Sequence, residues 1–282
     1  MIEHVEYDYE ELNRKDRLFP SRMVKDHSIL YHATTSLDET GIENSGFGGC
    51  RPLVTAPHVD QMMALYRSMN WEGLHSDGYA ALDQATGRFA LIDTPHAWFR
   101  ETAMRSLLYA ERDWAGGELV RAFRIAYADL VEFLGSEDVR QKHLHRQSQR
   151  PNSPVIRVDT ARLAAKLSAL RQTAETAEDL TRQYKYGLVY AVRFVEEDIP
   201  NLFYNRRSGI LHRGVLAPDR IVGKARLPLG SRMAPRRDDY GRMFSWCEGP
   251  FGAKIRTNQP DPVSRGERQI EQPEWLGDDV RA

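Results

Sequence analysis

Ser28-Ile29-Leu30-Tyr31-His32-Ala33-Thr34 is the stretch that decides the fold of this chain. Its apolar and aromatic residues are consecutive and it closes on a β-branched threonine, a pattern that predicts a buried β-strand. His32 then lies near the end of that strand, where its ring is buried by the strand and still within reach of a ligand. A histidine packed into the core gives the same pattern, so the rest of the chain has to decide between the two.

The segment after this strand predicts a loop between two helices. Residues 36–44 have the pattern of a short helix, and the glycines around Phe47 indicate a flexible loop. Residues 52–55 are predicted to form a short strand. Residues 57–69 follow as a helix, because apolar residues including Tyr66 recur at helical spacing.

The composition is that of a globular protein without a membrane span. Of its 282 residues, 41% are hydrophobic and 28% are charged, and the net charge is −1. This balance excludes a global field that draws the chain to nucleic acid or to a membrane. No apolar run reaches the roughly 18 residues of a transmembrane helix, and the N-terminus lacks the apolar segment of a signal peptide. The two cysteines, Cys50 and Cys247, lie far apart and lack zinc-ligand spacing. We therefore expect a cytoplasmic protein.

The remaining elements are expected as follows. The patterns predict strands at residues 89–92, 154–158, 187–194, 211–216 and 221–227, and helices at 98–109, 119–134 and from about 160 to 177. Residues 78–85 have a turn-like composition, 135–153 that of a long polar loop, and 231–282 that of an irregular tail.

The order of these elements resembles the ADP-ribosyltransferase superfamily. Tyr31-His32-Ala33-Thr34 with Gly46-Phe47 is similar to the opening NAD-binding motif, and residues 53–66 to the next one. Residues 189–194, followed by Gly214-Val215-Leu216-Ala217-Pro218-Asp219-Arg220-Ile221, resemble the final strand pair of the DNA-targeting ADP-ribosyltransferase toxins. The resemblance covers about half of the chain, in patches.

The resemblance implies how NAD, as substrate, would be held. His32 would hydrogen-bond a hydroxyl of the nicotinamide ribose, the backbone of Ala33 would hold the carboxamide, and Thr34 would steady the loop. Phe47 would lie against the pocket, and the ring of Tyr66 would stack on the nicotinamide. The glycosidic bond would break through an oxocarbenium-like transition state, as it does in glycosidases.

The toxins place a catalytic glutamate at the start of the late strand, and this chain has Ser208-Gly209-Ile210 there. Three interpretations stay open. A displaced carboxylate such as Glu197 does the work, with His212 in the strand and Arg51 facing a pyrophosphate as further catalytic candidates. Alternatively, the chain is an RNA 2′-phosphotransferase of the same fold, or a module that binds NAD, ADP-ribose or phosphorylated RNA without turnover.

Basic residues away from this site are candidates for contact with DNA or RNA. Those that we expect to follow a nucleic-acid backbone are Lys142, Arg146, Arg150, Arg206 and Arg207. His143 and His145 alternate as metal ligands on a strand would, but no third ligand lies nearby in sequence. We expect no metal site and a flexible basic loop.

The sequence thus predicts an α+β protein with an ADP-ribosyltransferase-like split mixed sheet and a helical insertion. Residues 1–26 would form a charged leader, 27–230 the domain, with the insertion at about 71–150, and 231–282 the tail. The predicted function is NAD-dependent ADP-ribosyl transfer to a macromolecule, with nucleic acid slightly favoured over protein. The sequence specifies neither that acceptor nor an inhibitory partner protein.

Overall fold

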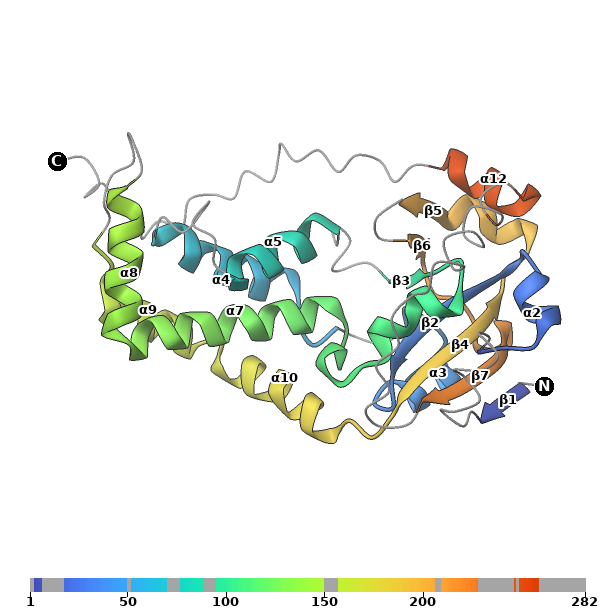
Figure 1. The fold of residues 1–282 in the computed structure, drawn as a ribbon, viewed down its shortest axis with the longest axis horizontal. Coiled ribbons are helices and arrows are strands. Elements are labelled where there is room, and N and C mark those ends of the chain that lie inside the picture. The colour runs from blue at the N-terminus through green and yellow to red at the C-terminus, as the bar shows by residue number, and fades with distance from the viewer. Residues whose placement is uncertain are drawn as a thin grey trace.

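The structure is a computed structural model, and it describes residues 3–6, 18–49, 52–69, 77–88, 95–149, 157–205, 209–227, 246 and 249–258. The protein is α+β, with the sheets at one end of an elongated molecule and a body of helices at the other (Figure 1). No helix in these ranges is both long enough and apolar enough to cross a membrane.

Seven strands form two sheets in the described part of the chain. The four-stranded sheet has the order β1 (Glu3–Glu6), β7 (Ile221–Leu227), β4 (Gly187–Arg193) and β2 (Ile29–Thr35). It is antiparallel except for the parallel pair β1 and β7. The antiparallel three-stranded sheet has the order β3 (His96–Phe99), β6 (Gly209–Arg213) and β5 (Leu202–Asn205).

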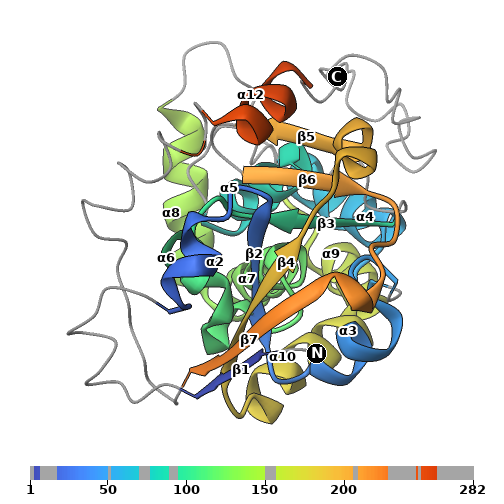
Figure 2. The same ribbon diagram turned by 90° about the vertical axis from the view of Figure 1, so that its right-hand side faces the viewer.

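The two sheets meet where β2 passes the end of β3 (Figure 2). Tyr31 and Arg100 form an isolated antiparallel bridge there, with reciprocal backbone hydrogen bonds of 2.9 and 2.7 Å. On its other edge, β2 pairs with β4 along its whole length. The stretch around His32 is therefore held by β4 on one side and borders the second sheet on the other.

The short helices near the sheets are α2 (Ser21–Lys25), α3 (Glu39–Ser45), α6 (Ala103–Ser106) and α12 (Pro250–Thr257), with 3-10 turns at Leu107–Ala110, Arg112–Trp114, Glu196–Asn201 and Pro218–Arg220. The helical body contains α4 (Ala56–Ser68), α5 (Asp77–Arg88), α7 (Glu118–Gly135), α8 (Glu137–Ser148), α9 (Thr160–Ser168) and α10 (Arg171–Gln183). It has its own apolar core, which includes Met62, Phe123, Phe133 and Leu167.

Several sequence predictions are confirmed. The strands expected at 28–34, 187–194, 211–216 and 221–227 and the helices expected at 36–44, 57–69, 119–134 and from 160 are present within a few residues. The last of these is interrupted near Ala169, so α9 and α10 are separate helices. Asp159 caps α9, because its carboxylate accepts the backbone N–H of Arg162 at 3.0 Å.

The prediction of a turn at 78–85 is wrong, because these residues belong to α5. Gly78 lies where α5 packs closely against neighbouring helices. A Cβ at this position would collide with the hydroxyl of Tyr66 and would lie 2.9 Å from the Cα of Ala126. The glycine therefore lets α5 approach α4 and α7 closely.

The predicted polar loop at 135–153 is also wrong, because its residues 137–148 form α8. Ser136 caps the helix, and ion pairs three and four residues apart support its exposed face. Its buried face is polar. Gln147 donates to the Met69 carbonyl at 2.9 Å, and His143 Nε2 lies 3.1 Å from the same oxygen. An apolar periodicity is absent, so the sequence pattern gives no helix signal here.

Other predictions differ in detail or fall elsewhere. Residues 52–55 form bends and a helix cap where a strand was expected, and the helix expected at 98–109 is β3 followed by two short helical pieces. Because β3 pairs with β6, the segment 71–150 also contributes to the sheets. In the tail, Trp246 is buried and donates to the His27 carbonyl. The strand expected at 89–92, residues 154–156 of the strand expected at 154–158, and both cysteines lie outside the described residues.

Candidate functional site

A cavity of about 270 Å³ lies where β2 and β3 meet. One wall comes from β2 and the loop after α3, and includes His32, Ala33, Thr34 and Phe47. These are the sequence-predicted substrate-binding residues apart from Tyr66. The structure therefore brings four of the five into one cavity, as the first motif predicts.

His32 has a defined orientation in this cavity. Its Nδ1 lies 2.8 Å from the backbone carbonyl of Trp98 on β3. Burial lowers the pKa of His32, although the Trp98 carbonyl and the nearby Asp38 oppose this effect. The ring is therefore neutral at pH 7. Because a carbonyl only accepts, Nδ1 carries the proton and Nε2 keeps a lone pair that can accept from a ligand hydroxyl.

Phe47 positions the histidine ring from the loop side. Its ring lies edge-on to His32, with centroids 5.0 Å apart, and also packs against Phe99 and Tyr190. The backbone of Phe47 pairs with Leu216 through hydrogen bonds of 2.9 and 3.0 Å. Gly46 precedes it with φ of +76°, and a Cβ there would collide with the Leu216 carbonyl. The loop is thus fixed by backbone geometry.

Thr34 steadies the turn after β2. Its hydroxyl donates to the Asp38 carboxylate, which also accepts a longer hydrogen bond from the Thr35 hydroxyl. Asp38 lines the cavity and immediately precedes α3. The turn that follows His32 is therefore closed by its own side chains, which agrees with the role expected for Thr34.

Aromatic and charged residues from 98–118 form the second wall, and the sequence analysis did not identify them. Arg100 is largely buried and donates to the hydroxyl of Tyr109 at 2.8 Å. The Tyr109 and Trp114 rings are T-shaped, with centroids 4.8 Å apart, and both line the cavity. Glu118, the first residue of α7, lines it as well. Of these, only Glu118 had a readable signal, because a glycine pair precedes it at the start of an amphipathic helix.

The predicted role of Tyr66 is wrong in this structure. Tyr66 is fully buried in the helical core and does not line the cavity. Its hydroxyl donates to the Ala126 carbonyl and the Asp129 carboxylate, both at 2.9 Å. It joins α4 to α7, so it contacts protein where nicotinamide was expected.

The two predicted catalytic residues that the structure describes, His212 and Glu197, do not line the cavity. His212 is buried on β6 opposite Ala97, packs near Phe194, and has a pKa lowered by burial. Glu197 is exposed in the 3-10 turn at Glu196–Asn201. Neither is among the residues that line the cavity. Arg51, the third candidate, lies outside the described residues.

Two residues of the predicted basic set are described, and neither lines the cavity. Lys142 and Arg146 are exposed on α8, at the opposite end of the molecule from β2 and β3 (Figure 1). Lys142 forms an ion pair with Asp138. Arg150, Arg206 and Arg207 lie outside the described residues. Among the described residues, no cluster of histidine, cysteine, aspartate and glutamate is arranged to hold a metal ion.

Comparisons of this chain with protein-family models, with curated proteins and with solved structures give no match. The site is therefore interpreted from its own geometry.

Proposed function

We propose that the protein is an NAD-dependent ADP-ribosyltransferase, with NAD bound in the cavity between β2 and β3. The observation that carries this proposal is His32, which is neutral and oriented by the Trp98 carbonyl. Its Nε2 is left to accept a hydrogen bond from a sugar hydroxyl. The resemblance of residues 31–34 and 46–47 to the opening motif of this superfamily points to the same role.

The size and lining of the cavity suit one half of NAD. Its volume of about 270 Å³ is near the lower limit for small-molecule sites, which suits a nicotinamide riboside rather than a whole dinucleotide. The rings of Phe47, Tyr109 and Trp114 offer aromatic surface to the nicotinamide. Arg100 adds a positive charge to the wall, which favours the phosphate side of the substrate.

Each residue then has a specific role. His32 Nε2 accepts from a ribose hydroxyl and fixes the sugar. The backbone of Ala33 holds the carboxamide, and Tyr109 and Trp114 replace Tyr66 as aromatic partners. When NAD is bound, the carbon–nitrogen glycosidic bond between its ribose and its nicotinamide would break, and nicotinamide would be released. A nucleic-acid acceptor and a cytoplasmic location remain predictions, because they rest on analogy and composition.

A binding module is the second candidate, and one observation favours it. The described strand Gly209–Arg213, where the toxins carry a glutamate, has no carboxylate. A protein that holds NAD or ADP-ribose without turnover would need only the orienting contacts of His32 and the aromatic wall. The 2′-phosphotransferase alternative requires basic residues that bind a phosphate. It has less support, since Arg213 at the end of β6 stacks on Phe203 and does not line the cavity.

Release of nicotinamide from NAD tests the proposal. Purified full-length protein is incubated with NAD alone and with single-stranded DNA, RNA or protein, and free nicotinamide is measured. We expect release that is lost in a His32→Ala variant and kept in His145→Ala, which changes an exposed histidine of α8. Saturable NAD binding without release under any condition would favour the binding module. Absence of both NAD binding and nicotinamide release would refute the assignment of this cavity as an NAD site.

A further inference from the structure

Two residues that line the cavity carry carboxylates, Asp38 and Glu118. The carboxylate of Asp38 already accepts the hydroxyls of Thr34 and Thr35, and its backbone carbonyl accepts the N–H of Ile42 in α3. Removing Asp38 would therefore open the turn after β2. These contacts explain Asp38 as a structural residue.

Glu118 reaches the cavity from the helical body, and a pair of glycines places it there. Gly116 and Gly117 have φ of +80° and +90°, a conformation that other residues rarely adopt. Both glycines line the cavity together with Glu118. A Cβ on Gly116 would lie 2.8 Å from Leu180 of α10, so the segment also packs closely on that helix. The turn from Trp114 into α7 therefore favours glycine at both positions.

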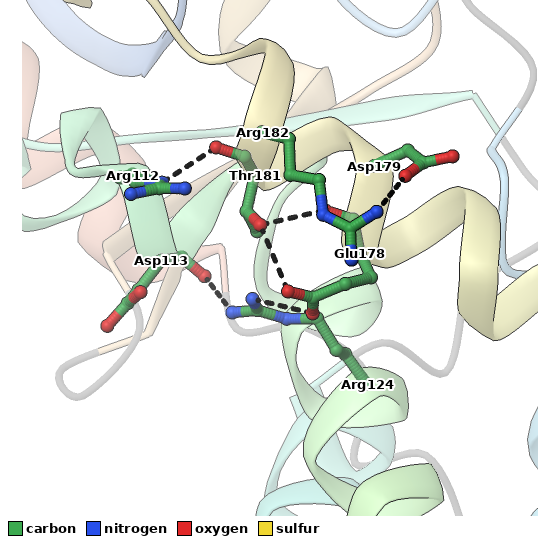
Figure 3. A network of polar contacts seen from close by, with 7 residues as sticks. All are labelled: Arg112, Asp113, Arg124, Glu178, Asp179, Thr181 and Arg182. Atoms are coloured by element: carbon green, nitrogen blue, oxygen red, sulfur yellow. Dashed lines mark hydrogen bonds and ion pairs between the residues drawn. The ribbon is translucent and has the colours of Figure 1, made fainter.

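A polar network holds this segment in place, and Figure 3 shows its members. Arg112 donates through Nε to the Thr181 carbonyl at 2.7 Å, and Arg124 donates to the Asp113 carbonyl at 3.1 Å. Arg124 also pairs with Glu178 of α10 at 3.3 Å. The turn that precedes Glu118 is thus tied to both α7 and α10, which restricts the backbone that leads into Glu118.

We propose that Glu118 is the catalytic carboxylate of the site, supplied by the helical body in place of a late-strand glutamate. This inference rests on the proposed function. The glycosidic C1′–N bond breaks, and its electron pair leaves with the neutral nicotinamide. Glu118 stabilises the positive charge that develops on the ribose. The acceptor's nucleophilic atom bonds to C1′, and its proton passes to Glu118 and then to water.

A charge-removing variant tests this role. Glu118→Gln keeps the shape of the side chain and should lower kcat for nicotinamide release about 100-fold or more, the usual loss for such a group. Its KM for NAD should change by less than about threefold, because His32 and the aromatic wall supply ground-state binding. The matched control is Glu132→Gln, on the exposed face of the same helix, which should retain the wild-type kcat.

A second pair of variants tests the position of the carboxylate without changing it. Gly117→Ala and Gly135→Ala both add a methyl group that meets no atom within 4 Å, but only Gly117 has a positive φ. The first should lower kcat at least about tenfold by displacing Glu118, and the second should not. Circular dichroism confirms that each variant is folded.

The outcomes separate the two claims. If the wild-type protein releases nicotinamide and Glu118→Gln does so at the same kcat, Glu118 is not the catalytic carboxylate and the proposed function stands. If Asp38→Asn alone loses kcat while KM and folding are retained, the assignment passes to Asp38 and the inference is overturned. If the wild-type protein releases no nicotinamide with any acceptor, both claims fail.

Discussion

Replacing Phe47 by alanine is expected to destabilise the protein and to weaken NAD binding together. The Phe47 ring is 1% exposed and packs against three rings, those of His32, Phe99 and Tyr190. Removal of a buried phenylalanine side chain usually costs about 3–5 kcal/mol. Because Phe47 also borders the cavity, fewer atoms surround it than in a closed core. We therefore expect a cost near the lower limit, about 3 kcal/mol.

The same change should weaken NAD binding about tenfold. An aromatic contact contributes about 0.5–1.5 kcal/mol beyond burial, and about 1.4 kcal/mol corresponds to a factor of ten. Binding can be followed by tryptophan fluorescence, since Trp98 and Trp114 line the cavity. Stability can be followed by urea unfolding.

Phe123→Ala is the matched control for this prediction. Phe123 is fully buried in the helical body and does not line the cavity. It should lose a similar free energy of unfolding and keep its affinity for NAD. Equal affinities of Phe47→Ala and wild type, or equal losses of affinity in both variants, would refute the reasoning.

Three further predictions concern how α3 and its loop are held. Lys224 is buried between the carboxylates of Glu39 and Glu43, so Lys224→Met should lower the free energy of unfolding in urea by about 2 kcal/mol. Lys142→Met removes one member of an exposed ion pair and should cost less than about 0.5 kcal/mol. Equal costs for the two variants would contradict this prediction. Hydrogen bonds from Lys224, Tyr186 and Arg226 outweigh burial and lower the pKa of Glu39 to about 2. The stabilisation that Glu39 provides is therefore complete above its ordinary pKa of 4.5 and is lost as the pH falls from there toward 2; acid unfolding of Glu39→Gln should have a shallower slope in this window, and an unchanged slope would refute the assignment. Gly46→Ala should cost about 2–4 kcal/mol, through its positive φ and the collision with the Leu216 carbonyl, and a wild-type urea midpoint would contradict the loop geometry.

The sequence predicts four of the seven described strands, β2, β4, β6 and β7, and the signal is clearest where an apolar run coincides with burial. Residues 187–193 are all apolar except for the terminal Arg193 and the initial Gly187, and Leu188 to Val192 are fully buried in β4. The first motif is equally local, since His32, Thr34 and Phe47 lie close in sequence and reach the cavity through one strand and one loop. A local sequence pattern is therefore sufficient to predict the cavity wall that β2 and the loop after α3 form.

The second wall of the cavity and several helices depend on contacts between residues far apart in the sequence, which a local pattern does not specify. The α8 helix is held by polar bonds to the Met69 carbonyl, and Gly78 in α5 marks close helix packing rather than a turn. Tyr66 has the correct periodicity for a helix, but its direction is set by Asp129 more than 60 residues away. Glu118 lines the cavity only because the fold brings the start of α7 to residues of β2 and β3. Tertiary packing, which no local pattern specifies, decides each of these positions.

The central claim is that His32 orients the ribose of NAD within the cavity between β2 and β3. The most direct measurement is a crystal structure of the full chain soaked with NAD. It should contain a hydroxyl of the nicotinamide ribose within hydrogen-bond distance of His32 Nε2, with the nicotinamide ring against the aromatic wall of Phe47, Tyr109 and Trp114. NAD bound outside this cavity, or a His32 Nε2 that contacts only protein in the complex, would contradict the account.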